Sequence, residues 1–276
     1  NKNGTFSEEL INQIQSISGA SMGADAADID NDGFNDLFVT EMLPSEYKRL
    51  KTVTTFEDWN KYQYNVKNGY YHQFTRNMLH RNNGISPGDK LTFSEVGRLA
   101  GVEATDWSWS ALITDFDNDG HKDLFVSNGL AQDILDQDYL KFISNEEITK
   151  MVVNQRGVDY KKLIDIIPIK KISNYAYSGD SNLGFKDVTD YWGLDMPSHS
   201  NGAAYGDLDN DGDLDLIVNN VNMPSFVYRN RTSELLKVNN FLKVKLEGEN
   251  NNINAVGAKV TIKANEQIFY LEQSPI

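Results

Sequence analysis

An acidic nonapeptide that occurs three times constrains the fold of this 276-residue chain more than any other feature. The copies read DIDNDGFND from Asp28, DFDNDGHKD from Asp115 and DLDNDGDLD from Asp207. A serine stands seven residues before each first aspartate, and an alanine stands four residues before it. The copies lie roughly 90 residues apart and indicate an internal repeat, so we expect a fold of repeated units.

The spacing D-x-D-N-D-G-x-x-D suits a calcium ion. Two unneutralised carboxylates about 4 Å apart repel by roughly 4 kcal/mol at an effective dielectric near 20, so the run opposes folding unless a cation lies within it. Carboxylates at positions 1, 3, 5 and 9 and the carbonyl of position 7 supply oxygen ligands, and the glycine at position 6 permits a sharp turn. We expect about three Ca²⁺ ions, one per loop, on these ligands: Asp28, Asp30, Asp32, Phe34 and Asp36; Asp115, Asp117, Asp119, His121 and Asp123; Asp207, Asp209, Asp211, Asp213 and Asp215.

The residues after each acidic run favour a strand over a helix. An EF-hand needs Glu at position 12, whereas valine stands there in all three copies (Val39, Val126 and Val218). The alternative without a metal is that Asp-Asn-Asp-Gly is present only because these residues favour a turn. Retention of every carboxylate in three copies favours the calcium site, in a strand–loop–strand unit.

Short β-favouring segments flank each loop, and further segments follow it downstream. Four short strands in each repeated unit are typical of a β-propeller blade, so the predicted fold class is all-β, with the calcium loop between the first two strands of a blade. The opening NGTFSEEL resembles LTFSEV at 91–96 and is predicted to be the last strand of a preceding unit. The other predicted strands are 24–27, 37–41, 78–84, 91–96, 111–114, 124–127, 174–180, 184–188, 203–205, 216–219 and 225–230.

Two insertions and a C-terminal segment depart from the repeat. Residues 41–76 and 130–171 contain helical patterns, the first helix being capped by Thr54 or Thr55. The insertions either line a binding face or pack over one end of the blades. Propeller blades are predicted for 1–237, and alternating strands at 241–248 and 257–273 predict the start of a small β domain over 238–276.

Aromatic residues in the first insertion are candidates for sugar binding, because insertions can be exposed. Trp59, Tyr70 and Tyr71 lie in the first insertion and form the preferred platform. The tryptophans at 107, 109 and 192 are expected to fill wedges between blades, and stacking on a sugar ring is their functional alternative.

Three stretches resemble the FG-GAP/VCBS repeat proteins, whose calcium-binding propellers include the integrin α-subunit head. They are GADAADIDNDGFNDLFVTEMLP, ATDWSWSALITDFDNDGHKDLFVSNG and SHSNGAAYGDLDNDGDLDLIVNNVN. NNINAVGAKVTIKANEQ resembles the opening of an ASPIC/UnbV domain, which follows such repeats in bacterial proteins. The resemblance implies a secreted, periplasmic or outer-surface protein whose loop aspartates bind calcium.

Composition excludes several functions. A net charge of −14, which three calcium ions would bring to about −8, argues against binding nucleic acid. No apolar run is long enough to span a membrane, and the chain has no cysteine. The N-terminus is not a signal peptide, so we expect a piece of a longer protein.

We expect a calcium-stabilised binding or adhesion module for a protein or carbohydrate ligand, without catalysis of its own. The alternative is a polysaccharide lyase or hydrolase with its site in the insertions.

Overall fold

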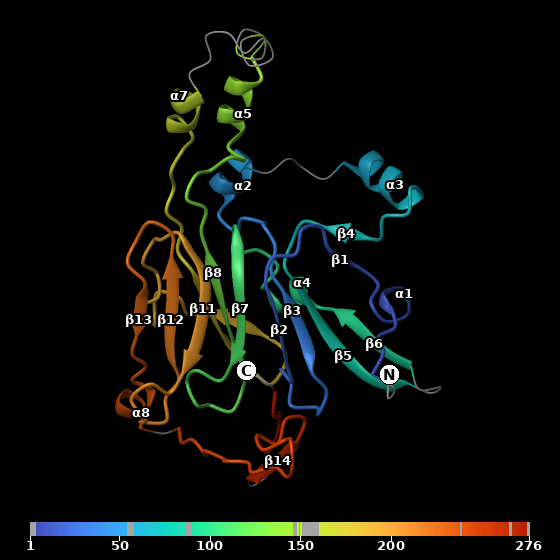
Figure 1. Ribbon diagram of the computed structural model, residues 1–276, viewed down its shortest axis with the longest axis vertical. Coiled ribbons are helices and arrows are strands. Elements are labelled where there is room, and N and C mark those ends of the chain that lie inside the picture. The colour runs from blue at the N-terminus through green and yellow to red at the C-terminus, as the bar shows by residue number, and fades with distance from the viewer. Residues whose placement is uncertain are drawn as a thin grey trace.

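The protein is mostly β-structure, arranged in several antiparallel sheets with few helices (Figure 1). This confirms the predicted all-β class. The computed structural model describes residues 4–53, 58–86, 90–145, 148, 150, 160–237, 239–264 and 267–274.

Three antiparallel sheets account for most of the strands, and in each of them an acidic loop joins the first two strands, as predicted. The first sheet has the order β2 (Ala24–Ala27), β3 (Asp36–Val39), β5 (Met78–Ser86) and β6 (Lys90–Glu95). The second has the order β7 (Ser108–Thr114), β8 (Asp123–Asn128), β9 (Tyr175–Gly179) and β10 (Phe185–Asp187). The third contains β11 (Ser200–Gly206), β12 (Asp215–Asn220) and β13 (Phe226–Tyr228).

The first strands of the three sheets lie side by side, with β7 in contact with β2 and β11 (Figure 1). The Asp25 carboxylate on β2 accepts a hydrogen bond from the Ile113 backbone N–H on β7, at 2.8 Å. Two apolar clusters fill the spaces between neighbouring sheets. Each contains the residue at position 2 of an acidic loop, Ile29 in one and Phe116 in the other. The conformation of these loops is therefore coupled to the packing between sheets.

The insertions lie beyond the ends of the sheets that face away from the acidic loops (Figure 1). They contain α2 (Tyr47–Val53), α3 (Trp59–Lys67), α5 (Gln137–Ile143), α7 (Tyr160–Asp165) and β4 (Gln73–Phe74), which pairs in parallel with β1 (Ile17–Ser18). The buried guanidinium of Arg49 on α2 forms ion pairs with Asp106 and Asp133. These two contacts join α2 to the segment that precedes β7 and to the second insertion.

The N-cap predicted for the helix that contains WNKYQYNV, which is α3 in the structure, is wrong. Asp58 caps α3, and its carboxylate accepts a hydrogen bond from the Asn60 backbone N–H at 2.8 Å. An ionised carboxylate caps a helix N-terminus well because it also interacts favourably with the helix dipole. Thr54 and Thr55, the predicted caps, lie outside the described residues.

Two predicted strands are absent from the described chain. Residues 4–9 belong to no sheet and lead into the short helix α1 (Leu10–Gln13), whereas NGTFSEEL was predicted as a strand. Residues 241–248 also belong to no sheet. The Phe241 ring lies against Gly212 and Lys243 pairs with Asp207, so this segment follows the third acidic loop instead of a neighbouring strand.

The C-terminal segment contributes one β-hairpin and lies on the side of the acidic loops (Figure 1). The hairpin pairs β14 (Lys259–Ala264) with β15 (Gln267–Glu272), within the range predicted from the alternation. Its aromatic rings approach two loop glycines, Tyr270 beside Gly33 and Phe269 beside Gly120. Two further short helices, α4 (Gly97–Ala100) and α8 (Thr232–Leu235), follow β6 and β13.

Candidate metal centres

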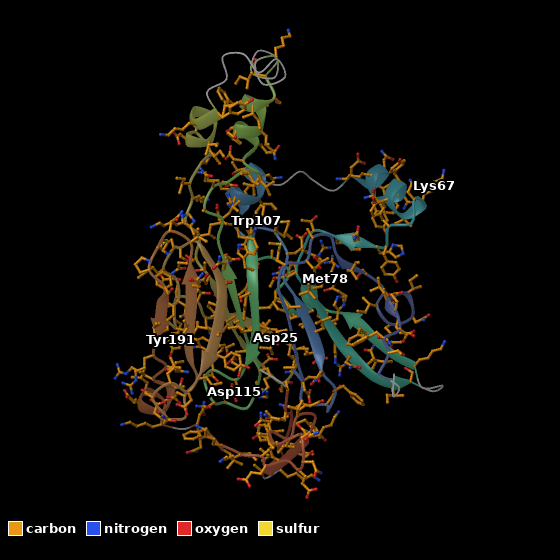
Figure 2. All side chains as sticks on the ribbon, in the orientation of Figure 1. Asp25, Lys67, Met78, Trp107, Asp115 and Tyr191 are labelled. Carbon is orange, nitrogen blue, oxygen red and sulfur yellow. The ribbon has the colours of Figure 1, made fainter. Side chains whose placement is uncertain are left out.

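Three clusters of carboxylates lie at one end of the three sheets, where Figure 2 shows Asp115 opposite the end that holds Trp107. In each cluster, oxygen atoms of three aspartates lie within 4.8 Å of one another and could hold a metal ion. The clusters are Asp28, Asp30 and Asp32; Asp115, Asp117 and Asp123; Asp207, Asp209 and Asp211. The first and third use loop positions 1, 3 and 5, whereas the second uses positions 1, 3 and 9.

The three loops share one backbone conformation. The asparagine at position 4 is left-handed in each, with φ of 56°, 55° and 62° at Asn31, Asn118 and Asn210. The glycine at position 6 has φ of 93° or 94° in all three, a conformation that residues with a Cβ rarely adopt. The carboxylate at position 5 accepts the N–H of position 7 in every loop; the pairs are Asp32 with Phe34, Asp119 with His121, and Asp211 with Asp213.

The aspartate at position 9 connects each loop to its sheet. It accepts two backbone N–H groups, one from position 2 of the loop and one from the third strand or from within two residues after it. The donors are Ile29 and Asn82 for Asp36, Phe116 and Gly179 for Asp123, and Leu208 and Asn230 for Asp215. A carboxylate oxygen that accepts one N–H keeps a second lone pair, so these side chains remain predicted cation ligands as well.

Neighbouring loops are also joined to one another. The Asn31 side chain of the first loop donates to the Gly120 carbonyl of the second, at 3.2 Å. The Asn118 side chain of the second loop donates to the Asp213 carboxylate of the third, at 2.9 Å. The Asp213 side chain is thereby engaged, which leaves its carbonyl as the predicted ligand. The three centres therefore form one connected row.

Two carboxylate oxygens in the clusters are buried without a hydrogen-bond partner: Asp30 Oδ1 and Asp207 Oδ1. A buried polar atom without a partner costs about 1–3 kcal/mol, and more when it is charged. Both atoms belong to the clusters that could hold a metal. A bound cation would satisfy them, so the residues present fit a hard, oxygen-seeking ion.

In the first and third loops an arginine pairs with the aspartates at positions 3 and 5, whereas the second loop has Lys122 at position 8 and no such arginine pair among the described residues. The Arg81 Nε atom lies 2.6 Å from an Asp30 oxygen, and Arg81 also approaches Asp32. Arg229 makes the same two contacts in the third loop, at 2.8 Å to Asp209 and 3.2 Å to Asp211. The corresponding residue beside the second loop is Ser178, because it too precedes the N–H that binds the position-9 aspartate.

Burial shifts the carboxyl groups of the second loop most strongly. Burial, followed by the charge of Asp117, raises the pKa of Asp123 to about 8. Burial and the charges of Asp119 and Asp115 raise the pKa of Asp117 to about 6. In the first loop, burial raises the pKa of Asp36 to about 6. These groups ionise reluctantly without a nearby positive charge.

Without divalent cations, the chain is expected to lose stability as the pH rises from about 4 to about 8. The folded-state pKa values of Asp36, Asp117 and Asp123 lie above the unfolded value, so the folded state binds more protons and each proton lost weakens it. Urea unfolding in chelator at pH 5 and pH 8 measures this, with greater stability expected at pH 5. Equal or lower stability at pH 5 would contradict the pKa shifts.

Substitution of Arg81 by methionine is expected to tighten cation binding in the first loop by at least about tenfold, because the guanidinium repels a divalent ion at the same carboxylates. Calorimetric titration measures the affinity. Arg76→Met is the matched control, since Arg76 pairs with Glu95 in the same sheet but outside the loop. Weaker binding in Arg81→Met would show that the guanidinium helps the site.

The cationic partners Arg81, Arg229 and Lys243 were not among the residues predicted from the sequence. One signal was present for the two arginines: an Arg-Asn pair follows the first loop at 81–82 and the third at 229–230, and the second unit lacks it. Lys243, 3.3 Å from Asp207, gives no such signal because it comes from the C-terminal segment.

The predicted sugar platform lies partly on a ladder of aromatic rings. Trp59 is exposed and stacks on Tyr62, with ring centroids 5.3 Å apart, and Tyr62 stacks on Phe74 at 5.6 Å. A cavity of about 490 Å³ beside the ladder is lined by Gln15, Ser16, Tyr62, Tyr71, His72 and Phe74. Tyr70 is exposed, and the Tyr71 hydroxyl donates to the Ile14 carbonyl.

The other predicted aromatic residues lie in or near the sheets. Trp192 packs against the apolar cluster between the second and third sheets. Trp109 is half-buried, and its indole N–H donates to the Gly129 carbonyl at 2.6 Å. Trp107 is also half-buried.

No protein-family model matches this chain, and no curated protein matches it at a significant level. Among the described residues, none of the helices has the length and apolar character needed to cross a membrane.

Proposed function

We propose that the three acidic loops bind calcium and that the chain is a calcium-stabilised β-propeller segment of the FG-GAP/VCBS type. The observation that carries the proposal is the repetition of one loop geometry, with a carboxylate cluster at the same place in three sheets. Oxygen-only ligands and a flexible coordination number suit calcium better than magnesium, which demands near-octahedral geometry. The ion would neutralise the carboxylates and hold the loop between its two strands.

Support for the propeller comes from three antiparallel sheets whose first strands lie side by side, with apolar clusters between them. The C-terminal hairpin would belong to a small ASPIC/UnbV-like β domain. We place the protein outside the cytoplasm or at the cell surface, in line with the sequence resemblance, as a binding or adhesion module.

The first insertion supplies a binding site for carbohydrate in this proposal. Aromatic faces such as Trp59 offer a flat apolar surface to a sugar ring, and His72 and Gln15 line the adjoining cavity with polar groups. A glycoside hydrolase of the common kind needs two carboxylates beside the bound sugar, and the residues that line this cavity include none. The site therefore favours binding over hydrolysis.

Substitution of Trp59 by alanine is expected to weaken glycan binding at least about tenfold while leaving the melting temperature unchanged, since the ring is exposed. A glycan array followed by calorimetry measures the loss. Tyr47→Ala, which removes a similarly exposed ring from α2, is the control and should bind as the unmodified chain does. Equal glycan binding by both variants would show that Trp59 does not form part of a carbohydrate site.

Calorimetric titration of the full chain tests the calcium assignment. We expect about three calcium ions per chain and much weaker binding of magnesium. Binding of magnesium as tight as that of calcium would contradict the assignment of the ion, and binding of neither would contradict the sites themselves.

A further inference from the structure

The third sheet lacks a strand that the first two sheets have. In the first and second sheets, β6 and β10 pair with the third strands β5 and β9. In the third sheet, β13 pairs with β12, and none of the described residues pairs with its other edge. An open strand edge presents backbone N–H and C=O groups that can pair with an added strand.

The fourth strand fills an apolar space between sheets as well as pairing with the edge. Phe185 of β10 and Leu183 before it pack against the cluster between the first and second sheets, which includes Tyr177 of β9. Tyr228 of β13 corresponds to Tyr177, because each pairs with the leucine that follows the position-9 aspartate. The third sheet has no counterpart of Phe185 in the described chain.

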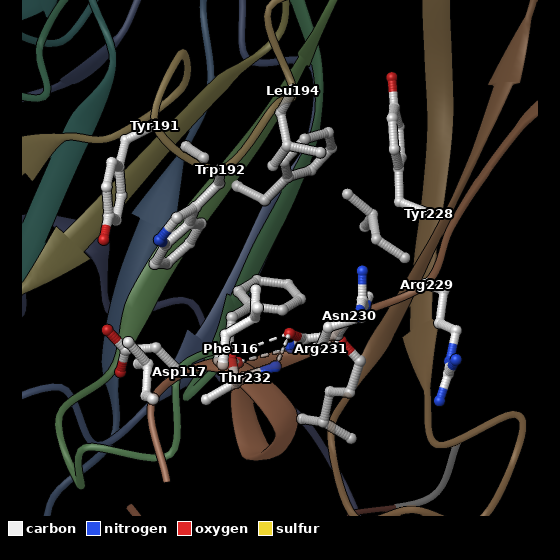
Figure 3. Close-up of a pocket in the computed structure, with 16 residues that line it drawn as sticks. Phe116, Asp117, Tyr191, Trp192, Leu194, Tyr228, Arg229, Asn230, Arg231 and Thr232 are labelled. Carbon is white, nitrogen blue, oxygen red and sulfur yellow. Dashed lines mark hydrogen bonds between the residues drawn. The ribbon is translucent and has the colours of Figure 1, made fainter. Parts of the chain in front are cut away.

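A cavity of about 470 Å³ lies where that counterpart would pack, between the second and third sheets (Figure 3). Its apolar lining includes Phe125, Trp192, Leu194, Leu216, Tyr228 and Leu235. The hydroxyl of Tyr228, whose side chain lines the cavity, is buried without a hydrogen-bond partner. The cavity is large enough for a phenyl ring, and its lining is of the kind that binds one.

The chain itself contains a segment with the sequence of a fourth strand. Residues 5–8 read TFSE, identical to 92–95 of β6, and a short helix follows each copy. Residues 4–9 belong to no sheet, and Phe6 is fully exposed. This segment and β13 lie on opposite sides of the molecule, so one chain cannot pair its own segment with its own edge (Figure 1).

We propose that residues 4–9 of a second copy of this chain add to β13 as the fourth strand of the third sheet, with Phe6 in the cavity. The register follows from the two complete sheets. Phe93 pairs with Asn82 and Phe185 with Gly179, and both partners donate to the position-9 aspartate. Asn230 is the equivalent donor in the third sheet, so Phe6 pairs with Asn230.

Sedimentation of the full chain over a range of concentrations tests the proposal, together with the variants Phe6→Ser and Ile11→Ser. Both side chains are exposed in the same N-terminal segment, so neither substitution disturbs the fold. The unmodified chain and Ile11→Ser are expected to self-associate equally. Phe6→Ser is expected to raise the dissociation constant at least about tenfold.

A synthetic peptide GTFSEEL, residues 4–10, provides the second measurement. It is expected to bind the chain and to dissociate the self-associated form, whereas the peptide with serine in place of phenylalanine is expected to do neither. A chain that stays monomeric and does not bind the peptide would overturn the proposal. Self-association that Phe6→Ser leaves unchanged would overturn it too, because the contact would then lie elsewhere.

Discussion

Removal of calcium with a chelator is expected to lower the melting temperature of the chain by at least about 15 °C. A site whose dissociation constant lies 100-fold below the calcium concentration stabilises the folded state by about 2.7 kcal/mol, so three sites contribute about 8 kcal/mol. Each kcal/mol shifts the melting temperature of a chain near this size by about 2–4 °C. Thermal unfolding in 1 mM calcium and in excess chelator measures the difference.

The expected loss is large because the loops are part of the core. Ile29 and Phe116, at position 2 of their loops, are buried in the clusters between sheets. Without the ion, each loop holds more carboxylates than its neighbouring arginine or lysine can neutralise, and their repulsion pushes the loop apart and so disturbs that packing. Magnesium in place of calcium is the control and should restore little of the loss. Equal melting temperatures for the chain in chelator and the chain in calcium would contradict a stabilising role of calcium in these loops.

Substitution of Asp123 by alanine is expected to reduce the free energy of unfolding by about 4 kcal/mol in chelator. The Asp123 side chain is fully buried and accepts the N–H groups of Phe116 and Gly179. Each donor left without a partner costs about 1–3 kcal/mol. In calcium the loss should grow by about 2.7 kcal/mol, because the second ion is lost as well. Denaturant unfolding under both conditions measures the two losses.

Asp180→Ala is the matched control for this substitution. The Asp180 carboxylate also accepts two backbone N–H groups, from Asn182 and Gly184, but it is exposed, so water can replace it. Its removal is expected to cost about 1 kcal/mol or less, with or without calcium. Equal losses of unfolding free energy in the two variants would show that burial of the Asp123 carboxylate does not determine how much it stabilises the fold.

The strands that flank the acidic loops could be predicted because local pattern and burial agree there. β2 ends at the residue before Asp28, and its bounds are those predicted. The segment 241–248 has the same alternation but belongs to no sheet, because Phe241 and Lys243 contact the third loop instead. Residues 5–8 read as a strand, yet no neighbouring edge in the described chain receives them. Strand propensity therefore predicts structure only where an edge is available.

The three acidic clusters could be predicted because the aspartates of each lie in one short run. The spacing revealed the aspartates at positions 1, 3 and 5, which the first and third clusters contain. It did not reveal that Asp36 and its counterparts tie the loop to the third strand, since Asn82 lies 46 residues further along the chain. Arg81 and Arg229 reach the loops from that same strand or just beyond it. Such contacts depend on sheet topology, which local spacing does not encode.

A crystal structure of the full chain grown in millimolar calcium, with anomalous differences measured, tests directly whether the acidic loops hold calcium. We expect one calcium peak in each acidic loop, with oxygen atoms of the aspartates at positions 1, 3 and 5 about 2.3–2.6 Å from the ion. Well-ordered loops without such peaks, with Arg81 and Arg229 still on their carboxylates, would contradict the assignment of these loops as calcium sites.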